Sequence, residues 1–230
     1  MFKFGENKSL QLFNILKDKK TGLLYRENSS DEITLKDVKS EYKKLYPFCK
    51  DKTILDMGAN IGIFTHYALE NGAKKVICYE PEEINYSILL NQNFKQVELH
   101  NVAITQSDSF IMLYSTPIKE GKKISTDNHS IKQIRGRTAK QVESLNFRKQ
   151  LDLHQPDILK VDIEGAEFIL DFKNLPECIK YIAIEIHYQL DEICSDKLLE
   201  VLRDQFNELD FKMKNMFKKK FAAVFIGERK

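Results

Sequence analysis

The sequence predicts an α/β fold built on a mostly parallel β-sheet. From Leu55 onward, short apolar runs alternate with amphipathic segments, which is the pattern of repeated strand–helix–strand units. A glycine-rich turn follows the first of these runs, and two later runs are apolar almost throughout, as central parallel strands are. With 230 residues, the chain has room for one such domain with a modest addition.

The first half of the pattern is regular. In chain order it predicts a strand, a helix, a strand, a helix and two short strands, at residues 53–59, 64–73, 75–80, 82–96, 97–104 and 109–115. The second helix is supported by Ile84, Ile88 and Leu89, which recur near helical spacing.

The second half predicts the remaining strands of the sheet. Residues 157–163 and 180–187 are compact apolar runs that fit its centre, and residues 196–206 form an amphipathic helix. Residues 211–217 and 220–228 are two strands joined by a lysine-rich turn. This C-terminal hairpin places an antiparallel strand in the sheet, which a plain dinucleotide-binding domain lacks.

Two segments lie outside the pattern. We expect residues 1–50 to form an N-terminal cap of helices, with or without a hairpin, on the substrate side of a core at 51–230. A polar insertion at about 116–150 breaks the rhythm of the core. Such an insertion is either a mobile surface loop or a lid over the substrate, and the sequence favours neither.

Composition excludes several classes of protein. With 36 Lys and Arg against 34 Asp and Glu, the net charge of +2 gives no reason to expect a nucleic acid partner. The cysteines lack the spacing of a zinc site or a disulfide framework, which fits a reducing interior; they are Cys49, Cys78, Cys178 and Cys194. No apolar run approaches the roughly 18 residues of a membrane span, and the first residues lack the apolar core of a secretory signal. We therefore expect a cytoplasmic protein with no membrane contact.

The strongest local signal is ILDMGANIGIFT at residues 54–65, where a strand turns into a helix. Gly58 and Gly62 allow close approach of backbone to a ligand and to the helix, and Asn60 tolerates the unusual dihedrals of such turns. Asp56 precedes the first glycine, unlike in the GxGxxG turn of dinucleotide binders. A pyrophosphate would be repelled by this carboxylate, whereas the cationic methionine moiety of S-adenosylmethionine would be attracted.

Two further segments complete the predicted cofactor site. Glu80 ends the second strand, about 20 residues beyond the turn, where a carboxylate can accept hydrogen bonds from both ribose hydroxyls. Residues 101–103 are placed to form the adenine edge. The alternatives are a helix-initiating carboxylate ahead of Pro81 and a plain strand end at 101–103. The full predicted set is Asp56, Gly58, Ala59, Asn60, Gly62, Phe64, Glu80, Pro81, Asn101, Val102 and Ala103.

The sequence resembles the FkbM family of methyltransferases. The resemblance rests on DMGANIGIFT, YEP, NVAI, LKVDIEGAE at 159–167 and IAIEIH at 182–187, in the family's order over roughly residues 50–190. It implies a Rossmann-like class I methyltransferase sandwich, with a seven-stranded, mostly parallel sheet and an antiparallel C-terminal hairpin strand. It also implies O-methylation of a hydroxyl on a sugar, a glycan or a related small molecule.

Four ionisable residues are expected at the reacting methyl group. Asp162 and Glu164 follow one central strand, and Glu185 and His187 end its neighbour, so all four should meet at the carboxyl edge of the sheet. In one arrangement His187 or a carboxylate is the general base, and this metal-free version is slightly favoured. In the other, Asp162, Glu185 and His187 bind Mg²⁺ or Mn²⁺.

Structural roles for these residues stay open. Glu164 and Glu167 would stabilise the start of a following helix, and His187 would be a hydrogen-bonded histidine at a strand end.

Other functions fit the sequence less well. An N-methyltransferase acting on nucleic acid or protein usually carries an Asn/Asp-Pro-Pro-Tyr-like segment after the fourth strand, where this chain has DIEG. An N-methyltransferase acting on a small molecule, a protein or a nucleic acid remains an alternative, as does a non-catalytic S-adenosylmethionine-binding subunit. The intact glycine turn and Glu80 argue against the non-catalytic subunit. An NAD-dependent oxidoreductase is disfavoured because GxGxxG is absent. The oligomeric state is left open.

Overall fold

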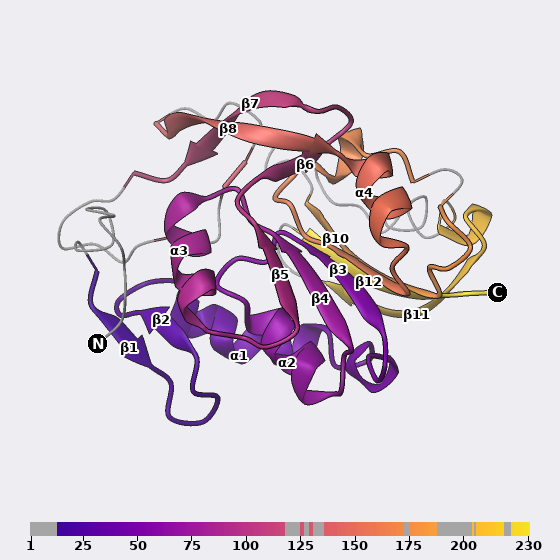
Figure 1. Ribbon diagram of the computed structural model, residues 1–230, viewed down its shortest axis with the longest axis horizontal. Coiled ribbons are helices and arrows are strands. Elements are labelled where there is room, and N and C mark those ends of the chain that lie inside the picture. Colours follow the sequence, from indigo (N-terminus) through magenta and orange to yellow (C-terminus); the bar gives the residue numbers. More distant parts are fainter. Residues whose placement is uncertain are drawn as a thin grey trace.

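The computed structural model describes residues 13–117, 125–126, 129–130, 136–172, 175–187, 204, 206–218 and 222–230. Its centre is a seven-stranded sheet (Figure 1) with the spatial order β11-β12-β10-β9-β3-β4-β5. The strands are β3 (Thr53–Met57), β4 (Lys75–Tyr79), β5 (Val97–His100), β9 (Ile158–Val161), β10 (Tyr181–His187), β11 (Phe211–Lys218) and β12 (Ala222–Arg229).

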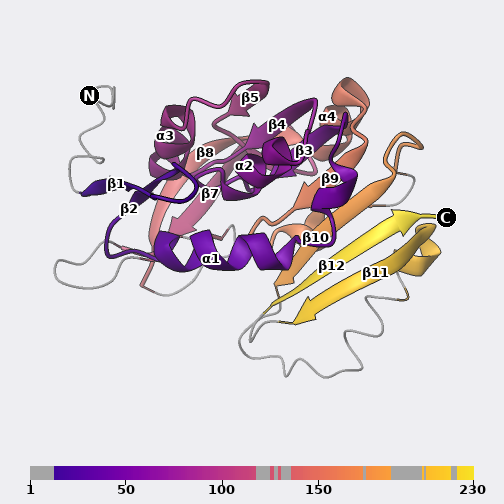
Figure 2. The same cartoon turned by 90° about the horizontal axis from the view of Figure 1, so that it is seen from below.

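The sheet has the predicted mixture of directions. Neighbouring strands from β10 through β9, β3 and β4 to β5 pair in parallel. The hairpin β11-β12 lies at the edge (Figure 2), and β12 pairs antiparallel with both β10 and β11. The chain leaves β3 toward β4 on one side and returns to β9 on the other, so the strand order reverses at β3. Ligands of open α/β sheets bind outside the carboxyl ends of the strands at this reversal.

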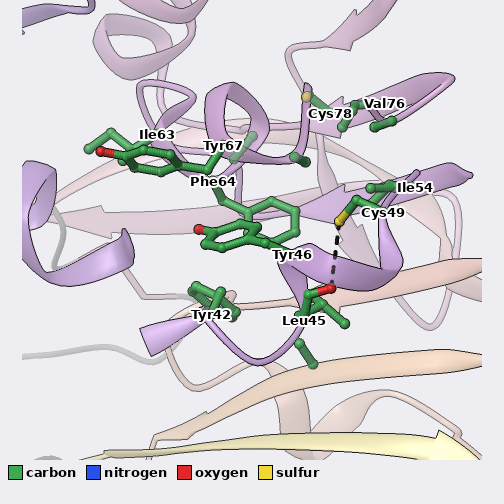
Figure 3. Close-up of a cluster of buried hydrophobic side chains, with 14 of the residues drawn as sticks. Tyr42, Leu45, Tyr46, Cys49, Ile54, Ile63, Phe64, Tyr67, Val76 and Cys78 are labelled. Carbon is green, nitrogen blue, oxygen red and sulfur yellow. Dashed lines mark hydrogen bonds between the residues drawn. The ribbon is translucent and has the colours of Figure 1, made fainter. Parts of the chain in front are cut away.

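Apolar side chains cover both faces of the sheet because successive strand residues point to opposite sides. Ile54 lies in one buried cluster and Leu55 in the other. The first cluster (Figure 3) joins the sheet to α2 (Ile63–Glu70) and to the N-terminal segment. Within it, the ring of Phe64 lies 5.1 Å from the ring of Tyr42. The second cluster packs against α4 (Phe147–His154) through Phe147 and Leu151.

The N-terminal segment contains both predicted kinds of element. Strands β1 (Ile15–Lys17) and β2 (Leu24–Arg26) form a hairpin, and α1 (Asp31–Glu41) follows. Arg26 and Asp31 form a buried ion pair at 2.8 Å, and Arg26 also donates to Asn85 of α3 (Glu83–Asn91) at 2.6 Å. The segment is therefore anchored to the core by buried polar contacts as well as by its apolar residues.

The predicted insertion is narrower than expected. The sequence predicts that residues 138–150 belong to a loop or lid, but they form β8 (Thr138–Asn146) and the first half of α4. β8 lies between β6 (Ala103–Thr105) and β7 (Ser109–Ser115) in a separate three-stranded sheet. Only Val142 and Ser144 of β8 are buried, so its sequence looks like a polar loop. Residues 118–124, 127–128 and 131–135 lie outside the described residues.

Other element boundaries differ from the prediction. The strand expected at 97–104 is divided into β5 and β6, which belong to different sheets. Segment 163–170 contains only the short 3-10 helix η3 (Glu167–Ile169), and a second one, η2 (Tyr46–Phe48), precedes β3. The helix predicted at 196–206 lies almost entirely outside the described residues. None of the helices in the described part of the chain is long and apolar enough to cross a membrane.

Candidate active site

A cavity lies at the carboxyl ends of β3, β4, β9 and β10, as the strand reversal predicts. One wall is α1, and another is formed by residues 102–104 with Leu113 of β7. Most of the predicted site residues line this cavity. They are Gly58, Ala59, Asn60, Phe64, Glu80, Pro81, Val102, Ala103, Asp162, Glu164 and Glu185.

The glycine turn is held by backbone contacts. The N–H groups of Gly58 and Ala59 donate to the carbonyl of Tyr79 at 2.9 and 3.0 Å. Gly58 has φ +80°, and a Cβ built there would lie 1.7 Å from the carbonyl oxygen of Asp162. Gly58 is therefore required by the packing of the turn on the end of β9, and not only by space for a ligand as the sequence indicated.

Gly62 serves packing rather than the cavity wall, which it does not line. A Cβ there would lie 2.6 Å from Leu89 and 2.7 Å from Phe94, so glycine lets α3 and the chain after it approach the start of α2.

Glu80 is buried at the end of β4, with 5% of its surface exposed. One carboxylate oxygen accepts the N–H of Asn60 at 2.8 Å, and the other accepts the N–H of Glu82 at 2.9 Å. A carboxylate offers about four lone-pair sites, so Glu80 can also accept a hydrogen bond from a hydroxyl donor. Burial raises the pKa of Glu80 to about 7, because the ionised form is poorly solvated. A diol and a nearby cation, as in S-adenosylmethionine, would favour the ionised form.

The segment after β5 supports Glu80 and extends the cavity. The side-chain amide of Asn101 donates to the backbone carbonyl of Glu80 at 2.8 Å, and Asn101 does not line the cavity. Val102 and Ala103 do line it, and with Pro81 they present an apolar surface suited to an adenine ring.

Asp56 lies behind the cavity instead of on its wall. It is fully buried, accepts a hydrogen bond from Thr65 at 2.7 Å and lies 3.1 Å from the ammonium of Lys160. Its negative charge is therefore matched by a buried cation, which contradicts our expectation that Asp56 attracts the cofactor directly.

Lys160 is a site residue that the sequence analysis missed. Its ammonium also donates to the carbonyl of Gly58 at 2.8 Å and lies 3.7 Å from Asp162. Burial alone would lower the pKa of Lys160, but Asp56 and Asp162 outweigh burial and raise it. A lysine inside the apolar run of β9 was the available signal, because a buried lysine requires a buried partner.

His187 lies among carboxylates beside the cavity. Its Nδ1 is 3.0 Å from Glu167, and its Nε2 is 3.4 Å from Glu164. The same Nε2 lies 3.6 Å from Glu185 and 4.0 Å from Asp162. The four predicted catalytic residues therefore do meet, although His187 itself does not line the cavity.

The surrounding carboxylates argue against the predicted role of His187 as general base. Burial alone would lower its pKa, but Glu164, Glu167 and Asp162 raise the pKa of His187 well above 6.5. These carboxylates favour the charged form of the imidazole, and the His187 ring does not line the cavity where an acceptor would bind. The geometry therefore disfavours His187 as the general base.

Glu164 is better placed than His187 to reach an acceptor in the cavity. It lines the cavity with 28% of its side chain exposed, and its φ of +55° is uncommon for a residue with a side chain. Burial raises the pKa of Glu164 well above 4.5, against the opposing effect of His187. Glu167 orders the loop, since it accepts the N–H groups of Ile163 at 3.0 Å and Gly165 at 2.9 Å.

The possible metal ligands at the cavity differ by one residue from the predicted set. The ligand atoms of Asp162, Glu167 and His187 lie within 4.8 Å of one another, so Glu167 takes the place that we expected for Glu185. A protonated His187 would have to lose its proton before it could bind a metal.

The N-terminal segment and the insertion contribute further residues to the site. Tyr42 is buried and donates to Asp162 at 3.5 Å, and His129 lines the cavity. Thr126 accepts hydrogen bonds at its carbonyl from Asn60 at 3.4 Å and Asn85 at 3.2 Å.

Comparison with known proteins identifies the family. A family model described as the methyltransferase FkbM domain matches residues 56–216. The chain belongs to the FkbM methyltransferase family. The match includes the glycine turn, Glu80 and all four predicted catalytic residues, so the resemblance noted in the sequence is confirmed. The domain is an S-adenosylmethionine-dependent methyltransferase domain, and the acidic cavity with Glu80 at its edge fits that cofactor.

Individual relatives are distant. "Methyltransferase 1" of Beauveria bassiana (strain ARSEF 2860) is 27% identical over 143 residues, which cover 53% of this chain and 57% of the relative. "Uncharacterized protein 158B" of Sulfolobus islandicus rod-shaped virus 1 is 33% identical over 138 residues, covering 60% and 62%. The match thus spans about three-fifths of the length of each relative.

A solved structure with a comparable chain course is less similar in sequence than these relatives. The ribosomal protein L11 methylase of Lactobacillus delbrueckii subsp. bulgaricus is 12% identical, with a TM-score of 0.46 over 87% of this chain and 79% of that chain. A likeness this remote says nothing about the acceptor.

Proposed function

We propose that the protein transfers the methyl group of S-adenosylmethionine to a hydroxyl of a sugar, glycan or related small molecule. The observation that carries this proposal is the charge of the cavity wall. Six carboxylate residues line it against one lysine; they are Asp37, Glu41, Glu80, Asp162, Glu164 and Glu185. Carboxylates are strong acceptors for hydroxyl donors.

The same charge argues against the rival acceptors. A carboxylate-lined cavity stabilises an amine in its ammonium form, which has no lone pair for attack on a methyl group. A hydroxyl is neutral and is not affected in this way. The wall would also repel the phosphates of a nucleic acid, which normally recruit a basic surface. A small-molecule or glycan alcohol therefore fits the cavity better than an amine or a nucleic acid.

Each residue has a role in this reaction. The cofactor, when bound, supplies a methyl group on a positively charged sulfur that leaves as a neutral thioether. Glu164 takes the proton of the acceptor hydroxyl as the new carbon–oxygen bond forms, and His187 stabilises the Glu164 carboxylate from 3.4 Å. Asp162 and Glu185 accept hydrogen bonds that orient the acceptor.

Glu164→Gln tests the assignment of the base. We expect turnover to fall by roughly a hundredfold or more, because the amide cannot accept the proton, while S-adenosylmethionine affinity changes little. His187→Asn is the comparison, since it removes the cation and leaves Glu164 ionisable. Full activity in Glu164→Gln would exclude it as the base.

A transfer assay with labelled methyl groups tests the acceptor class. The panel contains glycans, small alcohols, amines, RNA and protein, each with and without EDTA. We expect transfer to alcohols that survives EDTA. Transfer confined to amines or RNA would refute the proposal, and no transfer despite cofactor binding would favour a non-catalytic subunit. Loss of activity in EDTA that Mg²⁺ or Mn²⁺ restores would favour the metal arrangement at Asp162, Glu167 and His187.

A further inference from the structure

A second group of possible metal ligands lies on β5 and α4, outside the residues that line the cavity. Glu98 and His100 are alternate residues of β5, so they share one face of that strand, and His154 ends α4. One ligand atom from each of the three residues lies within 4.8 Å of the other two.

One ring nitrogen of His154, Nε2, is buried without a hydrogen-bond partner among the described residues. A buried polar atom left unpaired usually costs about 1–3 kcal/mol, so such an atom needs an explanation.

The other two ligands are already oriented. Nε2 of His100 lies 2.8 Å from one carboxylate oxygen of Glu98, and Lys75 holds the second oxygen at 2.6 Å. The ring of His100 stacks on Tyr79, with 4.9 Å between centroids and 13° between planes. Partners of this kind fix the direction in which metal ligands point.

We propose that Glu98, His100 and His154 bind a divalent transition-metal ion of the Zn²⁺ class, with water as the fourth ligand. Two imidazoles and one carboxylate are a common set for Zn²⁺, whereas Mg²⁺ prefers oxygen ligands. The Lys75 ammonium opposes a second cation, so the affinity should be moderate.

The bound ion would connect two parts of the fold. It would link the end of α4 to β5, the edge strand next to β4. Because an ion that binds only the folded chain stabilises it by mass action, the melting temperature should rise with Zn²⁺ concentration. The site also adjoins the cofactor region. The ring of His100 stacks on Tyr79, and the backbone carbonyl of His100 accepts the N–H of Glu80 at 3.0 Å.

Calorimetric titration of the whole chain with Zn²⁺, without cofactor, tests the proposal independently of methyl transfer. We expect one ion per chain, with affinity reduced by at least about tenfold in His100→Ala and His154→Ala. Two matched controls should bind as the wild type does. His66→Ala removes a histidine of α2 that lies 3.4 Å from Glu70, and His187→Ala removes the histidine at the cavity.

Three outcomes would overturn the site. They are no Zn²⁺ binding by the wild type, unchanged binding in His154→Ala, and binding lost in His187→Ala alone, which would place the ion at the cavity. Co²⁺ supplies a second readout, since a tetrahedral nitrogen and oxygen site gives visible absorption without the thiolate bands of a cysteine site. If a histidine variant does not fold, Glu98→Gln removes one ligand with little change of shape and carries the same expectation.

Discussion

The buried carboxyl of Glu80 should make the stability of the cofactor-free chain depend on pH. The pKa of Glu80 is 4.5 in the unfolded chain and about 7 in the folded one. Between these values the folded chain binds more protons, so Glu80 contributes stability that is fully present below pH 4.5 and is lost as the pH rises through about 7. The two pKa values correspond to about 3 kcal/mol in total, with a slope of at most about 1.4 kcal/mol per pH unit.

Glu80→Gln isolates this contribution because the amide does not titrate. We expect the free energy of unfolding of the wild type, minus that of the variant, to fall by about 3 kcal/mol between pH 4.5 and about pH 8. Urea denaturation at several pH values measures it, and other titrating groups cancel in the difference. The variant also loses a hydrogen bond to a backbone N–H, which shifts the difference by a constant.

Glu98→Gln is a control of opposite sign. Lys75 lowers the pKa of Glu98, so the same difference should rise with pH over the acidic range. A difference for Glu80→Gln that stays constant within about 1 kcal/mol would refute the reasoning. Ribose hydroxyls favour the ionised Glu80, so S-adenosylmethionine affinity should also increase from about pH 6 to about pH 8.

Two further predictions concern Gly58 and Lys160, which line the cavity. Gly58→Ala and Gly136→Ala place a side chain at nearly the same φ, +80° and +82°, but Gly136 has open space around it. We expect about 1–2 kcal/mol of destabilisation in Gly136→Ala and a much larger loss, or no folded protein, in Gly58→Ala; equal melting temperatures would contradict the packing role. Lys160→Met leaves the fully buried Asp56 without its cation, so unfolding in urea should show a loss of about 3–5 kcal/mol. Adding Asp56→Asn should recover part of that loss, and an unchanged midpoint in Lys160→Met would show that the pair does not matter.

Most of the fold was predictable from local sequence patterns. The central strands, the glycine turn and Glu80 were predictable because each depends on residues that are adjacent in the chain or one strand–helix unit apart. β8 was missed because just two of its residues are buried, so its polar sequence hides the alternation of a strand.

The candidate site was only partly predictable for the same reason. The meeting of Asp162, Glu164, Glu185 and His187 follows from strand order, and the structure bears it out. The raised pKa of His187 does not follow, because it depends on how many carboxylates surround the ring. The group formed by Glu98, His100 and His154 was missed altogether, since its members come together only when α4 packs beside β5.

Thr126 connects the insertion to the N-terminal segment and to the core through hydrogen bonds. Its N–H donates to the Ser30 hydroxyl at 2.8 Å, its hydroxyl donates to Asp31, and its carbonyl accepts from Asn60 and Asn85. A segment from another family member that is grafted into the insertion would lose these four hydrogen bonds unless it supplied an equivalent residue. Attempts to change acceptor specificity by recombination should therefore transfer the insertion together with the start of α1.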